Sequence, residues 1–209
     1  MTLRSCALML TLFSSLFASA QKRNVSDFAP TDGKIEKAAG GRLHVRSKEL
    51  RAVLKAKTSS NITVQFTYLG PTQEVSRLGD GSVRHQFGLK LRAKDICNLV
   101  YVMWHFDSPD DNRIEVSVKS NPGQATHEQC LDNGYIFKLN PTTTAPAPMV
   151  RPDEPHTLET LFVDKQLTVK ADGSVVWQGI LPDVAFLSDG PAGLRSDNAH
   201  VVFDYTVSK

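Results

Sequence analysis

The sequence predicts an all-β protein, a sandwich of two antiparallel sheets of the jelly-roll type. Apolar and polar residues alternate with a period of two along many short stretches, as they do in half-buried strands. Turn signals rich in Gly, Pro, Asp and Asn separate these stretches, and no stretch combines a helical period with capping residues. Many short antiparallel strands in one domain of this size are typical of a sandwich.

Each alternating stretch has one apolar row that we expect to face the core. The stretches 62–68, 86–92 and 113–119 show this pattern. Their apolar rows are Ile62, Val64, Phe66 and Tyr68; Phe87, Leu89 and Leu91; and Ile114, Val116 and Val118. The polar residues between them are expected on the outer faces of the sheets.

The C-terminal part carries the clearest hairpin signal. An Asp172-Gly173 pair, which suits a tight two-residue turn, separates two alternating stretches, and Trp177 in the second is expected in the core. A last strand follows over 199–207. Its apolar row consists of Val201, Phe203, Tyr205 and Val207.

The stretch 97–106, CNLVYVMWHF, divides into two faces by the same alternation. Its wholly apolar row, which we assign to the core, is Val100, Val102, Trp104 and Phe106. The opposite row is Leu99, Tyr101, Met103 and His105. If this strand has a functional side, the second row is that side.

The chain is expected to have three parts. Residues 1–20 combine one positive charge at Arg4, a short apolar run over 7–17 and a small-residue cleavage site, which predicts a secretory signal peptide and a secreted or periplasmic protein. The apolar run is too short for a stable membrane anchor, so no membrane insertion is expected after cleavage. Residues 21–41 are polar and are expected to form an extended N-terminal segment with little structure of its own, and 42–209 a single domain.

Charge and cysteine content narrow the function classes. The whole chain has 24 Lys and Arg residues against 22 Asp and Glu residues, and Arg4 is the one charged residue within 1–20. Neither a basic block nor a basic stripe is present, which argues against a nucleic-acid partner. Export leaves Cys97 and Cys130, which are expected to form a disulfide, since two isolated thiols outside a CxxC pair make a poor zinc site.

The closing residues resemble a known superfamily. HTLETLFVDKQLTVKADGSVVWQG, followed by GPAGLRSDNAHVVFDYTV, is similar to the last strands of concanavalin A-like lectin/glucanase domains, the jelly rolls of LamG-type modules and laminarinase-like enzymes. Trp177, Gly190 and Gly193 stand where those domains have a Trp and a Gly-containing loop. FTYLGPT, FGLKLRAKDICNLVYVMWHF and VSVKSNPGQATHEQC also resemble a family of exported bacterial proteins without an assigned activity. The resemblance implies binding or cleavage of polysaccharide on the concave face of one sheet.

The acid pattern of the glucanases in this superfamily, ExDxE or ExDxxE on one strand, is absent. RIEVSVK offers Glu115 alone, with Ser117 and Lys119 where further acids are expected. A retaining glycosidase needs two carboxyl groups about 5 Å apart. If the protein is an enzyme, a glycoside hydrolase or polysaccharide lyase, we expect its catalytic residues to be Glu115 and His105, with Glu115 or Asp107 orienting the imidazole.

The outward rows of the middle strands supply the candidate ligand-binding residues. They are Gln86, Lys90, Tyr101, His105, Glu115 and Ser117, joined by Gln65 and Thr67 if all these strands are neighbours. Hydrogen-bonding groups around an aromatic side chain suit a glycan groove. The alternative is an ordinary solvated sheet face.

The stretch DSPDDN, 107–112, is a weak metal candidate. Asp107, Asp110, Asp111 and Asn112 offer the oxygen ligands that calcium prefers, but the spacing is not that of an EF-hand and the composition also suits a hairpin turn. We expect no cofactor, with calcium as the ion to test.

Three functions remain open on the sequence. The leading hypothesis is an exported, non-catalytic, lectin-like domain that recognises a polysaccharide or surface glycan. The alternatives are a glycan hydrolase or lyase with an atypical site around Glu115 and His105, and a structural or protein-interaction module of the cell envelope, whose protein partner the sequence does not identify.

Overall fold

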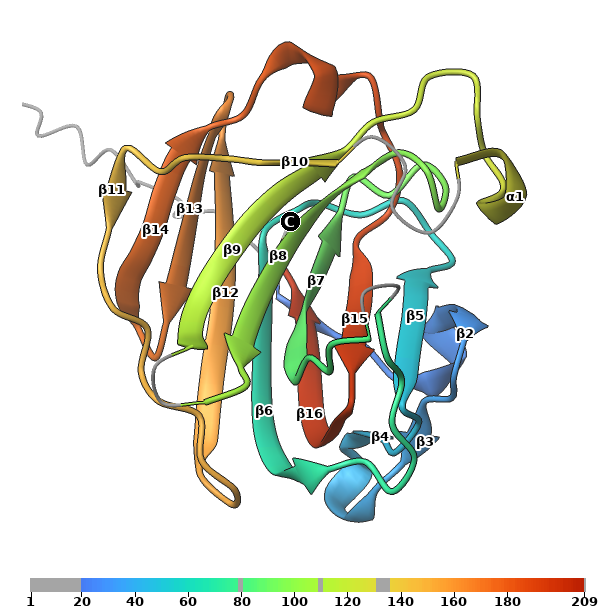
Figure 1. Cartoon of the computed structure of the whole chain (residues 1–209), viewed down its shortest axis with the longest axis vertical. Helices are drawn as coiled ribbons and strands as arrows, with labels where there is room; N and C mark the ends of the chain where they lie inside the picture. Colours follow the sequence, from blue (N-terminus) through green and yellow to red (C-terminus); the bar gives the residue numbers. More distant parts are fainter. Residues whose placement is uncertain (1–19, 79–80, 109–110, 131–135, 209) are drawn as a thin grey trace, which may run out of the picture.

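The computed structural model describes residues 20–78, 81–108, 111–130 and 136–208. Two antiparallel sheets pack face to face, which confirms the predicted all-β sandwich. Figure 1 shows the strands β9, β8, β7, β15 and β5 side by side in one of the sheets. Almost all of the proposed signal segment, 1–19, lies outside the described residues. Within the described ranges, no helix is long and apolar enough to cross a bilayer.

In the part of the chain that the structure describes, sixteen strands make up the two sheets. The nine-stranded sheet runs β11 (Thr143–Thr144), β14 (Ser174–Ile180), β13 (Gln166–Ala171), β12 (Pro155–Val163), β6 (Ile62–Pro71), β16 (Ala199–Val207), β4 (Leu43–Val45) and β3 (Glu36–Lys37), with β1 (Gln21–Lys22) also paired to β16. The seven-stranded sheet runs β10 (Ile136–Lys138), β9 (Asn112–Lys119), β8 (Leu99–Phe106), β7 (Gln86–Leu91), β15 (Gly193–Asp197), β5 (Glu49–Leu54) and β2 (Phe28–Asp32). Short helical turns lie at Val25–Asp27, Ala39–Gly41, α1 (His127–Cys130) and Asp183–Phe186.

The chain passes repeatedly from one sheet to the other. β5, β6 and β7 alternate between sheets, as do β14, β15 and β16, while β7–β8–β9 and β12–β13–β14 are local meanders. As a result, β15 is inserted between β7 and β5, and β16 between β6 and β4. The strand 62–71 lies in the nine-stranded sheet, so Gln65 and Thr67 do not share a face with the other candidate residues.

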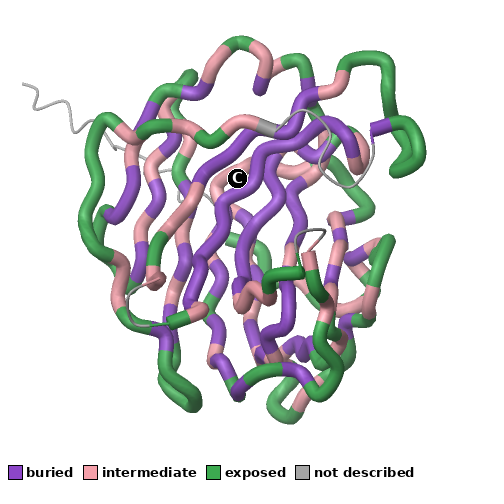
Figure 2. Tube along the Cα trace, in the orientation of Figure 1, coloured by how far each residue is buried: buried purple, intermediate pink, exposed green. Residues whose placement is uncertain are grey.

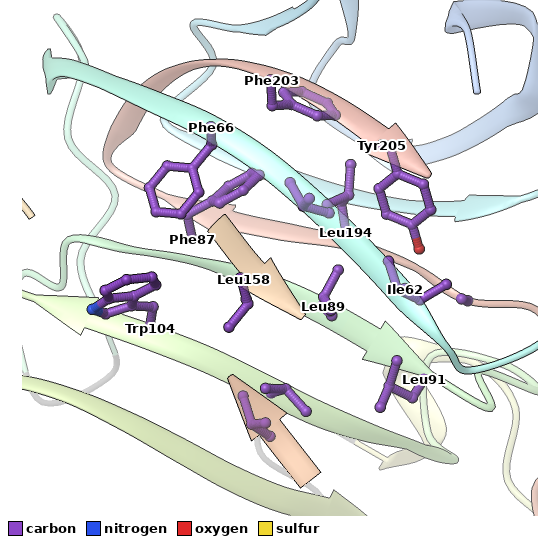
Figure 3. Close-up of a cluster of buried hydrophobic side chains, with 14 of the residues drawn as sticks. Ile62, Phe66, Phe87, Leu89, Leu91, Trp104, Leu158, Leu194, Phe203 and Tyr205 are labelled. Carbon is purple, nitrogen blue, oxygen red and sulfur yellow. The ribbon is translucent and has the colours of Figure 1, made fainter. Parts of the chain in front are cut away.

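The rows expected to face the core do so. The large side chains with almost no exposed surface include Phe66, Phe87, Trp104 and Phe203, which meet between the sheets (Figure 3). The ring of Trp104 stands edge-on to that of Phe66, with centroids 5.6 Å apart. Trp177 is also in the core, as predicted, with 3% of its surface exposed.

A buried Trp needs a partner for its indole N–H. Nε1 of Trp104 donates to Oδ1 of Asn112 at 3.2 Å, and the amide of Asn112 donates to the carbonyls of Ala147 and Pro148 at 2.8 and 2.7 Å. The Pro- and Thr-rich stretch 140–155 is therefore an extended connector, held against the edge of the sandwich. Its strand β11 adds a short pairing with β14.

The segment 21–41 differs from the expectation of little structure of its own. β2 pairs with β5, β1 with β16 and β3 with β4, and the ring of Phe28 packs edge-on against that of Tyr205 with centroids 5.3 Å apart. These strands are too short to show a period in the sequence. Their partners are sheet edges distant along the chain.

The hairpin turn at Asp172-Gly173 is confirmed. Both residues have positive φ, 48° and 80°, and β13 and β14 pair directly across them. The carboxylate of Asp172 also accepts a hydrogen bond from the amide of Thr157 at 2.7 Å and contacts Nδ1 of His156 at 2.9 Å. The turn is thereby joined to β12.

The predicted disulfide between Cys97 and Cys130 is present and joins the loop before β8 to α1. Both residues are buried. The bond closes a loop over a sequence separation of 33 residues.

Removing this disulfide is expected to lower the free energy of unfolding by about 3 to 4 kcal/mol, because the unfolded chain regains the entropy of the open loop. The measurement is urea unfolding of a Cys97→Ala, Cys130→Ala double variant. Wild type in reducing buffer serves as the control and should give the same loss. A loss below about 1 kcal/mol would contradict the prediction.

Candidate functional site

The candidate site lies on the outer face of the seven-stranded sheet, the face turned away from the core. Strand register places the candidate residues in neighbouring cross-strand rows. One row contains Gly193, Lys90, Tyr101 and Ser117; the next Arg195, Gly88, Met103 and Glu115; and the third Asp197, Gln86, His105 and Arg113. The structure therefore brings Gln86, Lys90, Tyr101, His105, Glu115 and Ser117 onto one continuous surface.

Gly193 allows these rows to form. A Cβ at this position would lie 2.1 Å from the carbonyl oxygen of Ala52 on β5, a distance that no side chain tolerates. Glycine therefore lets β15 approach β5 closely while pairing with β7 on its other edge.

The outer face is more enclosed than a solvated sheet surface. β7 and β8 are buried along their whole length on both faces (Figure 2). Leu99, Tyr101 and Met103 form an apolar cluster with Ala93, separate from the main core, and Val53 packs against it. The face therefore differs from the ordinary solvated sheet surface that the sequence left open as the alternative.

A charged cluster occupies one side of this face. Arg51 contacts one carboxylate oxygen of Asp197 at 2.6 Å, and Nε of Arg195 contacts the other at 2.9 Å. The side-chain amide of Gln86 donates to Asp197 as well. Burial opposes ionisation of Asp197, but the two guanidinium groups and the hydrogen bonds outweigh it, so the pKa of this carboxyl lies below its usual value.

The sequence reasoning missed Arg51, Arg195 and Asp197. Alternation within 49–54 and 193–197 does place them opposite core residues, so a signal was present. Their meeting depends on the insertion of β15 between β5 and β7, which joins strands far apart along the chain.

Arg195 also lies over the ring of Tyr101, with the guanidinium carbon 5.1 Å from the ring centroid. A cation over an aromatic face is attracted by the π-electrons, and the attraction grows when water is excluded. Tyr101 thus holds a guanidinium group rather than presenting a free stacking surface.

Lys90 lies beside this cluster with 4% of its surface exposed. Burial, reinforced by the positive charges of Arg51, Arg195 and Lys119, lowers the pKa of Lys90 to about 7. Its amine titrates near neutral pH.

His105 is buried without a hydrogen-bond partner on either ring nitrogen. Burial and the charge of Arg113 lower its pKa to about 4, so the imidazole is neutral near pH 7. Neither Asp107 nor Glu115 orients the ring by a hydrogen bond.

Glu115 is paired elsewhere. Its carboxylate contacts Nζ of Lys138 at 2.7 Å and the guanidinium of Arg113 at 3.7 Å. Burial opposes its ionisation, but the hydrogen bond from Lys138 and the nearby positive charges lower its pKa below the usual value. A general acid for glycoside cleavage needs a raised pKa, so Glu115 is poorly suited to that role.

The acidic stretch 107–112 is occupied by interactions within the protein. Asp107 accepts from the amide of His85, Asp111 pairs with Arg113, and Asn112 holds Trp104 and the connector. Asp110 lies outside the described residues. Across the described ranges, no group of three or more His, Cys, Asp or Glu side chains is placed to hold a metal ion.

A cavity lies elsewhere, at the β2–β5 edge. It has a volume of about 670 Å³ and is lined by both acidic and basic residues, among them Glu36, Arg46, Lys48 and Glu74. Beside it, His44 and His200 stack with ring centroids 4.7 Å apart, and Nε of Arg46 donates to His44 at 3.2 Å. Burial and Arg46 lower the pKa of both histidines.

No protein-family model matches the chain, and no curated protein matches it in sequence. Solved structures match its fold. The carbohydrate-binding module CBM66 from Bacillus subtilis superposes with a TM-score of 0.56 and 15% identity, over 86% of this chain and 93% of that one. The metal-free Emp46p carbohydrate recognition domain superposes with a TM-score of 0.52 and 12% identity, over 88% of each chain.

A protein from Parabacteroides distasonis ATCC 8503, provisionally classed as a glycosyl hydrolase, gives a TM-score of 0.51 and 11% identity, over 91% of this chain and the whole of that one. At such identities these similarities concern the fold. They confirm the jelly-roll fold that the closing strands indicate.

The buried imidazole predicts a pH-dependent loss of stability. The pKa of His105 in the folded protein, about 4, lies below the usual histidine pKa of 6.5. As pH falls from 6.5 to about 4, His105 takes up a proton in the unfolded chain but not in the folded chain. The free energy of unfolding therefore falls by about 3 kcal/mol in total. His105→Leu should remove this loss.

The measurement is urea unfolding at pH 7.5 and 4.5, with the same substitution at the exposed His127 as the matched control. Between pH 7.5 and 4.5, the free energy of unfolding of wild type should fall by about 2 to 3 kcal/mol more than that of His105→Leu. An equal pH dependence in both proteins would show that His105 is not buried in neutral form.

Proposed function

We propose that the protein is an exported, non-catalytic carbohydrate-binding domain that recognises a polysaccharide or surface glycan on the outer face of the seven-stranded sheet. One observation carries the proposal. Donor-bearing side chains from four adjacent strands, Arg51 on β5, Arg195 on β15, Gln86 and Lys90 on β7 and Tyr101 on β8, converge on a single patch of that face.

Such a patch has the chemistry that sugars require. Glycan hydroxyl groups are recognised by fixed hydrogen-bond donors and acceptors, and the ion pairs around Asp197 hold both guanidinium groups in place before any ligand arrives. Arg51 and Arg195 retain 18% and 17% of their side-chain surface. A ligand can therefore reach them without unfolding the cluster.

The similar folds support a glycan ligand. CBM66 is a carbohydrate-binding module and the Emp46p domain a carbohydrate recognition domain, and each covers most of this chain. Their sequences are too distant to transfer binding residues.

The carboxylates of the face favour binding over hydrolysis. Glu115 and Asp197 both have lowered pKa values and both are engaged by cations. Glu49 contacts Arg51 at 3.4 Å and accepts a hydrogen bond from Ser76. Neither Glu115 nor Asp197 is suited to protonate a leaving glycoside oxygen.

One observation supports an enzymatic alternative. His105 is neutral near pH 7 with both ring nitrogens free of partners, so it can accept a proton from a ligand, as the base of a glycan lyase or hydrolase does. Release of reducing ends or unsaturated sugars that Glu115→Gln and His105→Gln both abolish would establish this alternative.

The binding proposal is tested by a polysaccharide panel. We expect the protein to bind at least one polysaccharide, and Arg195→Met to weaken that binding at least tenfold, because the donor closest to Tyr101 is lost. Gln65→Ala, on the outer face of the nine-stranded sheet, is the matched control and should bind as wild type does. Affinity electrophoresis measures binding, and thermal melts identify variants that fail to fold.

If no glycan binds, or if Arg195→Met binds as wild type does while folded, the outer face is not a glycan site. Capture of a protein partner under those conditions would favour the interaction-module alternative.

A further inference from the structure

We propose that the ligand of the outer face is an anionic glycan, whose carboxylate or sulfate group is bound between Lys90, Arg51 and Arg195. The inference rests on the proposed function and specifies its ligand class. It comes from an imbalance of charge that the protein leaves within an enclosed part of the face.

Lys90 is the first sign of this imbalance. The residue is 96% buried by surface area, yet its amine forms neither a hydrogen bond nor an ion pair with any residue in the described ranges. Buried ammonium groups are normally paired, because removing a charge from water without compensation is costly. An unpaired one, aimed at a face already rich in donors, marks a place for an acceptor from outside the chain.

The neighbours of Lys90 do not supply that acceptor. The charged or titratable residues facing it are Glu49 and Arg51 on β5, Arg195 and Asp197 on β15, Tyr101 and His105 on β8, and Glu115 and Lys119 on β9. The carboxylate next to it, Asp197, is already shared by Arg51, Arg195 and Gln86. Glu115 is paired with Lys138, and Glu49 with Arg51.

Positive charges therefore outnumber negative ones immediately around Lys90, in a chain that is close to neutral overall. The charges that act on Lys90 are positive at Arg51, Arg195 and Lys119 and negative at Asp197. Elsewhere in the sheet, Asp111 pairs with Arg113 and Asp32 lies opposite Arg51. The formal net charge of the whole chain is +2, so this excess is a local feature. Guanidinium groups bind carboxylate and sulfate oxygens with matched geometry, which a neutral sugar cannot exploit as fully.

Anion binding is expected to be coupled to proton uptake. The pKa of Lys90 in the free protein is about 7, and a bound anion raises it by favouring the charged amine. The affinity for the anionic glycan is therefore highest below pH 7. It falls as pH rises from about 7 toward the pKa that Lys90 has in the complex. A neutral glycan produces no such dependence through Lys90.

The experiment measures binding calorimetrically at pH 6.0 and 8.5, in buffers of different ionisation enthalpy. The probes are polygalacturonate for carboxylate, dextran sulfate for sulfate, and dextran and pullulan as neutral polymers. Wild type should bind one of the acidic polymers, at least tenfold more weakly at the higher pH, with proton uptake at pH 8.5. Lys90→Met should bind at least tenfold more weakly at pH 6.0 and lose the pH dependence.

Two controls distinguish a loss of binding at the site from misfolding and from general electrostatic attraction. Lys90→Met removes a buried charge, so its melting temperature should equal or exceed that of wild type. Lys165→Met removes the same charge from the exposed β12–β13 turn of the other sheet and should leave binding unchanged.

The outcomes distinguish the inference from the proposed function. Binding of neutral glycans alone, lost in Arg195→Met, overturns the anionic ligand but leaves the carbohydrate-binding proposal intact. The placement of the anion site at Lys90 is wrong if an acidic polymer binds and Lys90→Met leaves that binding unchanged. It is also wrong if Lys165→Met weakens the binding as much as Lys90→Met does. Failure to bind any probe, acidic or neutral, counts against both.

Discussion

The structure depends on one constraint: the central strands of the seven-stranded sheet are buried on both faces. In an antiparallel sheet the face away from the core is commonly open to water. Here the outward side chains of β7 and β8 are nearly as enclosed as the inward ones. Every polar group placed there must therefore be paired within the protein or remain costly, and that requirement determines the chemistry of the face.

Asp197 provides much of this pairing. It is the carboxylate to which Arg51, Arg195 and Gln86 converge from three neighbouring strands, and Arg195 in turn rests on Tyr101. His105 has no hydrogen-bond partner on either ring nitrogen, and within the described ranges Lys90 forms no ion pair with Asp197. Unpaired buried polar groups reduce stability, and the proposed anionic ligand would supply the partner that Lys90 lacks.

Asparagine side chains show how the surrounding chain is held. Asn112 joins Trp104 to the connector over 140–155. Asn198, in the tight turn between β15 and β16 with a φ of 52°, accepts from the amide of Ser76 at 2.7 Å and donates to the carbonyls of Ser76 and Arg84. Both satisfy backbone groups of irregular segments, which a buried loop must do to be stable. Asn112, which the sequence offered as a weak metal ligand, thus serves to hold a loop in place.

The sequence by itself determined the class of fold, the core rows, the hairpin at Asp172-Gly173, the disulfide and the division of β8 into two faces, because these depend on local periodicity and on residue chemistry. It also identified the outward residues of β7, β8 and β9 that form part of the candidate site, because these strands are consecutive and pair as a meander. The tertiary structure decided the rest. Crossovers inserted β15 beside β7 and moved β6 to the other sheet, bringing in Arg51, Arg195 and Asp197, and burial changed the pKa values of Lys90 and His105. Neither which strands are neighbours nor how much water reaches a side chain is encoded by a local pattern, since both depend on contacts between residues far apart in the chain.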